Sequence, residues 1–207
     1  MRVTCFDFWN TLARSLQGGG ASYADVLVRL GAKPETIYPI VRDDLMAGIF
    51  DYEQMVEHLC SRLGLVATSI DIAEAVTNWA CDNERAAWFN GAVELLNALR
   101  EQDDKLILIT NITAPAWEAV NLRLNVARRF DKCFLSCVAG FSKPDPRVWN
   151  YVEWSYPNAR EYWMIGDNEA DDLTIPTSMG WKTILTGTEG VPLVEIPRII
   201  HRGGGVK

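Results

Sequence analysis

The sequence predicts an α/β protein with a doubly wound parallel sheet as its core and a small all-helical domain inserted near its start. Two observations lead to this prediction. Short runs rich in Ile, Val, Leu and aromatic residues alternate with helical patterns towards both ends of the chain, whereas residues 22–88 show helical patterns only. Strands separated by helices favour a parallel sheet covered on both faces. The length of 207 residues suits one such core with one insertion.

Five short runs are expected to form the strands, because each is rich in strand-forming residues and is followed by polar, glycine or proline residues. These runs are residues 3–8, 106–110, 133–137, 162–166 and 182–186. The helices expected around them cover residues 92–100, 116–126, 146–153 and 171–179. After residue 190 we expect a short final element and a frayed tail.

The insertion has helix start and stop signals of its own, and we expect four helices in it. Asp51 has the character of an N-cap before a helical apolar pattern, and Gly64 is the matching stop signal. Pro34 suits a first helical position, and either Thr68 or Ser69 could cap a later helix.

These signals predict a division into two domains. Residues 18–89 are expected to form the helical cap, and residues 1–17 together with 90–207 are expected to form the core. The glycine-rich segment 17–20 is expected to be a flexible entry into the cap.

Composition excludes several classes of function. Acidic residues outnumber basic ones 27 to 20, and the resulting net charge of −7 has the wrong sign for binding a nucleic-acid backbone. No window approaches roughly 18 consecutive apolar residues, so no membrane crossing is expected, and the N-terminal run is too mixed for a signal peptide. The five cysteines form no CxxC pair and have no ligand-spaced histidine, which argues against zinc and favours reduced thiols in a cytoplasmic protein.

Polar residues follow the expected strands, where open α/β sheets bind their ligands. Asp7 could attack phosphorus, Thr110 and Asn111 could hydrogen-bond phosphoryl oxygens, and Lys143 could offset negative charge. Asp7 and Asp167 could together hold Mg²⁺ through oxygen ligands. Each residue alone is also typical of a turn or a helix cap, but their ordered occurrence favours a site for phosphoryl chemistry.

This ordered set resembles the motifs of the haloacid dehalogenase superfamily, whose members are mostly magnesium-dependent phosphatases with a Rossmann-like core and a mobile cap. The superfamily motifs are a strand ending in Asp-x-Asp-x-Thr, a strand ending in Ser or Thr, a lysine, and Gly-Asp followed by a further Asp. The matching residues are Asp7 and Thr11, then Thr110, then Lys143, and finally Gly166 with Asp167 and Asp172. The resemblance covers residues 1–20 and 90–190, and the helical insertion stands where the superfamily places a C1-type cap.

The resemblance implies a nucleophile and a metal site. Asp7 would be the nucleophile that forms an aspartyl-phosphate. Mg²⁺ would be bound by Asp7, by the backbone carbonyl of Trp9 and by Asp167. The substrate would be a small phosphorylated molecule.

The resemblance also implies roles for the residues around that centre. Lys143 and Thr110 would hold the phosphoryl group. Asp172, or alternatively Asp171, would orient Lys143 or a metal-bound water. The remaining candidates for substrate contact are Thr11, Asn111 and Trp9.

Trp9 departs from the superfamily motif. In the related phosphatases the second Asp of the first motif protonates the leaving alcohol and later activates water, and an indole can do neither because it offers only an N–H donor. Three consequences remain open. The substrate has a leaving group that needs little protonation, another acid such as Glu169 or a cap residue takes over, or turnover is slow.

Two other functions compete with a phosphatase. Dehalogenases of the superfamily carry Tyr at the position of Trp9, but they use no metal and have Ser-Ser-Asn in place of Gly-Asp, so Asp167 argues against this function. The second competitor is a binding or regulatory protein that keeps the fold with little catalysis.

Aromatic and basic residues near the site have two interpretations each. Trp9, Trp79 and Trp88 could line an aromatic entrance for an apolar or planar substrate, although most of the eight tryptophans are expected simply to pack in the core. Arg14 and Arg42 could bind a substrate carboxylate or a second phosphate, and solvated surface positions are the alternative.

Overall fold

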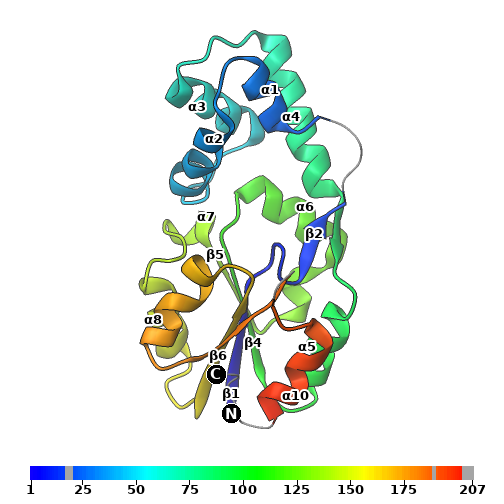
Figure 1. Ribbon diagram of the computed structural model, residues 1–207, viewed down its shortest axis with the longest axis vertical. Coiled ribbons are helices and arrows are strands. Elements are labelled where there is room, and N and C mark those ends of the chain that lie inside the picture. The colour runs from blue at the N-terminus through cyan, green and yellow to red at the C-terminus, as the bar shows by residue number, and fades with distance from the viewer. Residues whose placement is uncertain (17–20, 188–189, 202–207) are drawn as a thin grey trace.

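The computed structural model describes residues 1–16, 21–187 and 190–201. Its helices α1 to α4 form an upper group, and a layered sheet with its flanking helices forms the lower part (Figure 1). The predicted entry segment 17–20, the boundary between residues 17 and 18, and the tail from residue 202 lie outside the described residues.

The lower part is built on a sheet of five parallel strands, which confirms the predicted doubly wound sheet. The strand order is β5-β4-β1-β6-β7. The strands are β1 (Arg2–Phe6), β4 (Lys105–Thr110), β5 (Lys132–Leu135), β6 (Glu161–Gly166) and β7 (Lys182–Leu185). β1 pairs with β4 on one side and with β6 on the other, so the direction in which strands are added to the sheet reverses at β1. In open α/β sheets a ligand-binding crevice lies beyond the carboxyl ends of the strands at such a reversal.

Helices cover both faces of the sheet because successive side chains of a strand point to opposite faces. Phe6, Leu108 and Trp163 belong to the apolar core on one face, and Cys5, Ile107 and Met164 belong to the core on the other. The first face carries α5 (Ala92–Arg100), α6 (Ala114–Leu124) and α10 (Ile196–His201), with 3₁₀ turns at Val126–Arg129 and Leu193–Glu195. The second face carries α8 (Arg147–Ser155), and α9 (Thr174–Ser178) follows β6 on that side.

The upper helices form the expected four-helix block. They are α1 (Tyr23–Arg29), α2 (Pro34–Ile40), α3 (Tyr52–Leu63) and α4 (Ser69–Glu84), with a π-helical turn at Val41–Leu45. A separate apolar core that includes Leu27, Leu45 and Leu59 holds them together. We refer to this block, residues 21–84, as the cap; the domain limits predicted from the sequence remain a prediction.

The local start and stop signals of the cap are confirmed. Asp51 and Thr68 each close a capping box, with the Asp51 carboxylate accepting a hydrogen bond from the Gln54 N–H at 2.8 Å. Thr68, and not Ser69, is the N-cap of α4. Gly64 ends α3 with a φ of 66°, a left-handed conformation that glycine adopts without steric cost.

A short antiparallel ribbon, which the sequence analysis missed, joins the cap to the core. It pairs β2 (Ala13–Ser15) with β3 (Ala86–Trp88). Strands of three residues are too short to show an alternating pattern, so only their pairing across the insertion reveals them.

Several predicted element limits were wrong. The strand predicted at 133–137 ends at Leu135, where α7 (Ser136–Ala139) begins, because a short apolar run does not distinguish strand from helix. The first strand ends at Phe6 and not at residue 8, so Asp7 follows the strand. The helix predicted at 171–179 starts earlier, as a π-helical turn at Glu169–Leu173, because the Asn168 side chain accepts hydrogen bonds from the N–H groups of Ala170 and Asp171.

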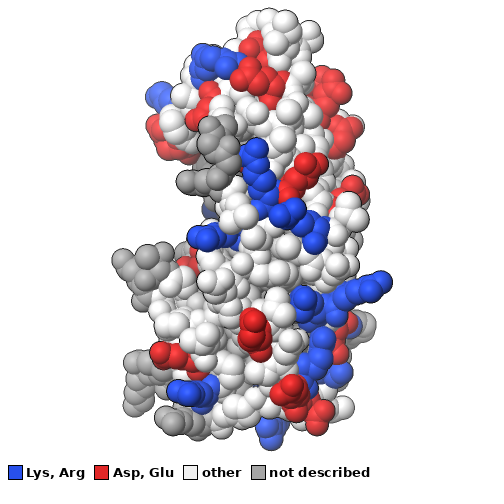
Figure 2. All heavy atoms as spheres, turned by 90° about the vertical axis from the view of Figure 1, so that its right-hand side faces the viewer, with Lys and Arg blue, Asp and Glu red and all other residues white. Residues whose placement is uncertain are grey.

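The described surface carries charges of both signs. Figure 2 shows Lys and Arg side chains interspersed with Asp and Glu side chains over one face of the molecule. Among the described residues, no helix combines the length and the apolar character that crossing a membrane requires.

Candidate active site

The candidate residues meet at the carboxyl edge of the central strands. Asp7 follows β1, and its backbone N–H donates to the Ile165 carbonyl of β6 at 2.9 Å, which fixes where the carboxylate emerges. Asp167 follows β6 and Asn111 follows β4. Lys143 comes from the loop between α7 and α8.

Lys143 is held between two carboxylates. Its ammonium nitrogen lies 2.6 Å from Oδ1 of Asp7 and 2.5 Å from Oδ1 of Asp172, and its side chain is only 3% exposed. Burial alone would lower the pKa of the Lys143 ammonium, but the two carboxylates raise it well above its usual value. Lys143 is therefore positively charged at any pH at which the protein would act.

The carboxylates outnumber this cation. Burial raises the pKa of Asp7; the Lys143 ammonium opposes the rise, and the Asp167 carboxylate adds to it. Burial and the neighbouring Asp172 carboxylate likewise raise the pKa of Asp167. A divalent cation beside these groups would favour their ionised forms and offset their mutual repulsion.

The donor set fits a magnesium ion. Carboxylate oxygens of Asp7, Asp167 and Asp172 lie within 4.8 Å of one another, and Mg²⁺ prefers oxygen ligands of this kind. The two oxygens of Asp172 already accept hydrogen bonds, one from Lys143 and one from the Asn168 N–H at 3.1 Å. Asp7 and Asp167 are therefore the better candidates for direct ligands, while Asp172 orients Lys143. The backbone carbonyl of Trp9 as a third ligand remains a prediction.

Three further hydrogen bonds hold Asp167 and the backbone of Lys143 in position. Thr11 donates through Oγ1 to Oδ1 of Asp167 at 3.2 Å. The Asn111 side chain brackets the backbone of Lys143, because its Nδ2 donates to the Lys143 carbonyl at 3.0 Å and its Oδ1 accepts from the Lys143 N–H at 2.8 Å. Asn111, expected to contact phosphoryl oxygens, thus also positions the lysine loop.

Gly166 is required by the packing of this site. A Cβ atom at Gly166 would collide with the side chain of Asp172. The glycine of the Gly-Asp motif therefore makes room for the carboxylate that orients Lys143.

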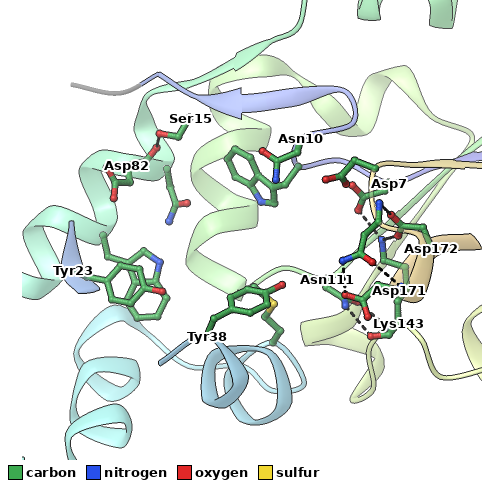
Figure 3. Close-up of a pocket in the computed structure, with 16 residues that line it drawn as sticks. Asp7, Asn10, Ser15, Tyr23, Tyr38, Asp82, Asn111, Lys143, Asp171 and Asp172 are labelled. Atoms are coloured by element: carbon green, nitrogen blue, oxygen red, sulfur yellow. Dashed lines mark hydrogen bonds and ion pairs between the residues drawn. The ribbon is translucent and has the colours of Figure 1, made fainter. Parts of the chain in front are cut away.

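A pocket of about 390 Å³ lies between this sheet edge and the cap (Figure 3). The predicted site residues that line it are Asp7, Trp9, Asn111, Lys143, Asp167, Asp171 and Asp172. Thr11 and Thr110 are 1% exposed and do not line it, so any contact from Thr110 to a phosphoryl group needs a local opening. Glu169 is exposed and lies outside the lining, which weakens its candidacy as the missing acid.

The cap contributes a wall that the sequence analysis mostly missed. Tyr23, Tyr38, Met46, Asp82 and Asn83 line the pocket together with Trp79, which was a candidate. The missed residues follow no motif, and their approach to the core depends on how the cap packs above it. A pattern within one helix carries no signal of that packing.

Trp88, Arg14 and Arg42 do not line this pocket. Trp88 and Arg14 line a separate hollow of about 790 Å³, which reaches Asp167 but contains neither Asp7 nor Lys143. The guanidinium of Arg14 lies 5.4 Å from the centre of the Phe89 ring, and Arg42 pairs with Asp43 at 2.6 Å. The solvated-surface interpretation suits Arg42 better than a grip on substrate.

Comparisons with known proteins agree with this geometry. Residues 1–175 match the haloacid dehalogenase-like hydrolase family. Among curated proteins, none matches the chain.

Solved structures of the same fold span different activities. The 2-haloacid dehalogenase from Pseudomonas syringae pv. tomato DC3000 is 19% identical, with a TM-score of 0.66 over 99% of this chain and 100% of that chain. A HAD family enzyme from Bacteroides thetaiotaomicron, in complex with magnesium and inorganic phosphate, is 17% identical, with a TM-score of 0.65 over 91% of this chain and 96% of that one. A predicted phosphoglycolate phosphatase from Haemophilus somnus 129PT is 18% identical, with a TM-score of 0.62 over 96% and 97%. At these identities the likeness shows a shared fold.

Proposed function

The chain belongs to the haloacid dehalogenase-like hydrolases, and from that premise we propose that it is a magnesium-dependent phosphohydrolase acting on a small phosphorylated molecule. The observation that carries the proposal is the pair of contacts by which Lys143 joins Asp7 to Asp172 beside Asp167. All five cysteines are unpaired thiols, which supports the proposed cytoplasmic location.

In the proposed reaction, Asp7 acts as the nucleophile. An oxygen of its carboxylate bonds to phosphorus while the bond from phosphorus to the ester oxygen breaks, and the departing alkoxide takes up one proton. Water then attacks phosphorus in the aspartyl-phosphate, which releases inorganic phosphate and restores the Asp7 carboxylate. The hydrogen bond from the Asp7 N–H to the Ile165 carbonyl of β6 supports this role, because a nucleophile must be held in line with the bond that breaks.

Lys143 and the acidic residues prepare the site for a phosphoryl group. Bound magnesium would neutralise charge on the phosphoryl oxygens and align them for in-line attack. Lys143 places a second positive charge beside Asp7, and Asp172 with the Asn111 bracket holds that charge in position. Cap residues over the pocket limit the access of bulk water to it.

A 2-haloacid dehalogenase is the second candidate, because a solved structure of that activity shares the fold. Trp9 is also aromatic, as is the tyrosine that dehalogenases of the superfamily carry at this position. A 2-haloacid carries a carboxylate that its enzyme must bind. The pocket is lined by the carboxylates of Asp7, Asp82, Asp167, Asp171 and Asp172, and Lys143 is the only cationic side chain among its described lining residues. A phosphoryl group is also anionic, but bound Mg²⁺ would offset these carboxylates, whereas a dehalogenase without a metal would have Lys143 alone, and this difference favours the phosphohydrolase.

The test is phosphate release by wild type and by Asp7→Asn, with and without Mg²⁺, on a panel of phosphomonoesters that includes p-nitrophenyl phosphate. We expect release that requires Mg²⁺ and that falls about a thousandfold or more in Asp7→Asn, because the nucleophile is lost. Asp103→Asn, an exposed change of the same type, serves as the control and should keep wild-type activity. Release that survives in Asp7→Asn would refute the assignment of the nucleophile, and metal-independent halide release from 2-chloropropionate would favour the dehalogenase.

A further inference from the structure

We propose that the cap end of the pocket binds an alkylammonium group, so that the substrate is a phosphomonoester with a positively charged amine at its far end. This inference rests on the proposed function for the phosphoryl end of the same pocket. The cap end itself is defined by Tyr23, Trp79, Asp82 and Asn83.

The pocket has two chemically different ends. Figure 3 shows Asp7, Asp172 and Lys143 at one end and Tyr23, Asp82 and Ser15 at the other. One cavity joins the two groups, so a single elongated ligand can contact both. The cap end is therefore available for the organic part of a phosphomonoester bound at Asp7.

Aromatic rings form one wall of the cap end. The rings of Tyr23 and Trp79 stack with their centres 3.9 Å apart and their planes at 11°. Trp79 also packs against Tyr52, at 6.2 Å between ring centres, and is only 6% exposed, so neighbouring side chains hold this ring in place. The negative face of such a ring attracts organic cations through the ring quadrupole, and stacking leaves one outer face on each ring of the pair.

Asp82 supplies the negative charge of the cap end. Its backbone carbonyl accepts a hydrogen bond from Ser15 Oγ at 2.6 Å, which ties α4 to the ribbon strand β2. Its carboxylate, in contrast, has no hydrogen bond or ion pair with any residue that the structure describes. Burial raises the pKa of Asp82, and the positive charge of Arg85 opposes this rise only in part. A bound cation would supply the missing compensation.

Asn83 adds a hydrogen-bond acceptor. It is 7% exposed and lines the pocket, and its Nδ2 donates to the Tyr52 hydroxyl at 3.0 Å. Its side-chain oxygen accepts no hydrogen bond from the described part of the chain. An amide oxygen that lines the pocket without a protein donor can accept a hydrogen bond from a ligand N–H.

The charge balance excludes an anionic group at this end. Lys143 is the one cation among the described lining residues, and Asp7 and Asp172 already engage it. A second phosphate or a carboxylate at the cap end would face Asp82 without a basic partner. A neutral alkyl group would fit the rings but would leave the Asp82 carboxylate and the Asn83 oxygen unpaired.

The experiment compares two series of substrates with magnesium present. The first consists of ω-aminoalkyl phosphates of increasing chain length, and the second of n-alkyl phosphates in which a methyl group replaces the ammonium. We expect kcat/KM to be about tenfold higher for the amine at the chain length that spans the pocket, as a cation on aromatic rings beside a half-buried carboxylate would give. The corresponding carboxyalkyl phosphates should be the poorest substrates.

Asp82→Asn tests the assignment directly. This variant should reduce the preference for the amine to about twofold or less while leaving kcat/KM for the n-alkyl phosphates near wild type. Glu57→Gln removes one negative charge from an exposed position of the cap and should keep the full preference. A wild type that prefers no amine at any chain length, or an Asp82→Asn that keeps the preference, would overturn the proposal.

Measurements of ligand binding test the cap-end site independently of the proposed phosphohydrolase activity. If no ester is hydrolysed, dissociation constants of the same two series are measured by calorimetry on wild type and Asp82→Asn. Tighter binding of the amines by wild type alone would support the cap-end site even though the phosphohydrolase had failed. Hydrolysis that requires Mg²⁺ and Asp7 but shows no preference for amines would keep the phosphohydrolase and refute the cap-end site.

Discussion

In the proposed reaction, Trp9 stands where a proton donor for the leaving alcohol is expected. Its side chain lines the pocket and packs edge-on against Phe8, with ring centres 5.1 Å apart, so it fills space that a shorter side chain would leave open. An indole N–H does not titrate usefully, so it cannot pass a proton to an alkoxide. Asp171 and Asp82 also line the pocket, and burial raises the pKa of both, but each extends from a different wall.

Restoring a carboxyl group at position 9 should speed the hydrolysis of alkyl phosphates. For Trp9→Asp we expect kcat on n-alkyl phosphates to rise about a hundredfold, since proton transfer to a poor leaving group is worth roughly that much or more. On p-nitrophenyl phosphate the rate should change little, because nitrophenolate leaves without a proton. Trp9→Asn is the matched control, with the same size and the same loss of packing but no titratable group. Equal rates for the two variants would mean that another group supplies the proton.

At the level of single residues, the motif positions were predictable, whereas Trp79 was the one cap residue of the described pocket lining that was proposed from the sequence. Asp7 directly follows β1, and Lys143 and Asp172 belong to short motifs that occur in a fixed order along the chain, so all three could be proposed although they lie far apart in the sequence. Asp82 and Asn83 occupy the last turn of a helix, and nothing in α4 itself indicates that this turn faces the core.

The elements show the same contrast. Helix ends that depend on neighbouring residues, such as the capping boxes at Asp51 and Thr68, could be predicted because the cap and its partner lie three residues apart. The β2–β3 ribbon pairs Ala13 with Trp88 across the whole insertion, so no local pattern reports it. The helical segment after β6 begins early because Asn168 is its N-cap. The apolar pattern alone did not indicate which residue would take that position.

The loop that carries Lys143 should depend on β4 for its position. Asn111→Ala removes both hydrogen bonds that join the end of β4 to the Lys143 backbone, so the ammonium group should lose its alignment with Asp7. We expect kcat/KM to fall about 10- to 100-fold, because small misplacements of a catalytic group carry such costs. Asn121→Ala, which removes a similar bond to the Ala127 N–H away from the site, should lower the melting temperature without this loss of activity. A kcat/KM for Asn111→Ala within about twofold of wild type would show that the bracket is dispensable.

At the scale of the whole molecule, the candidate site and a buried ion-pair network lie at opposite ends of the sheet. The pocket opens at the carboxyl ends of the strands, beneath the cap, whereas the N-terminus lies at the far end of the core (Figure 1). At that far end the guanidinium of Arg2 donates to both oxygens of Asp104 at 2.9 Å, and Thr4 Oγ1 donates to Asp104 at 3.2 Å. Arg2 also reaches the Ile200 carbonyl at 3.3 Å, so the network joins β1, the start of β4 and α10.

Breaking this network should lower the free energy of unfolding without changing kcat/KM. Asp104→Ala removes the nearer of two carboxylates from the Arg2 guanidinium, which is 6% exposed, and leaves only Glu161 at 3.6 Å, so the free energy of unfolding should fall by about 3 kcal/mol in urea titrations. Replacing both residues with apolar ones, Arg2→Met with Asp104→Leu, should recover most of that loss, because no buried charge then remains unpaired. Below the melting temperature of each variant, kcat/KM for phosphate release should match wild type, since the network lies at the opposite end of the strands from Asp7. A loss of kcat/KM in Asp104→Ala while the protein is still fully folded would show instead that the two ends of the sheet are coupled.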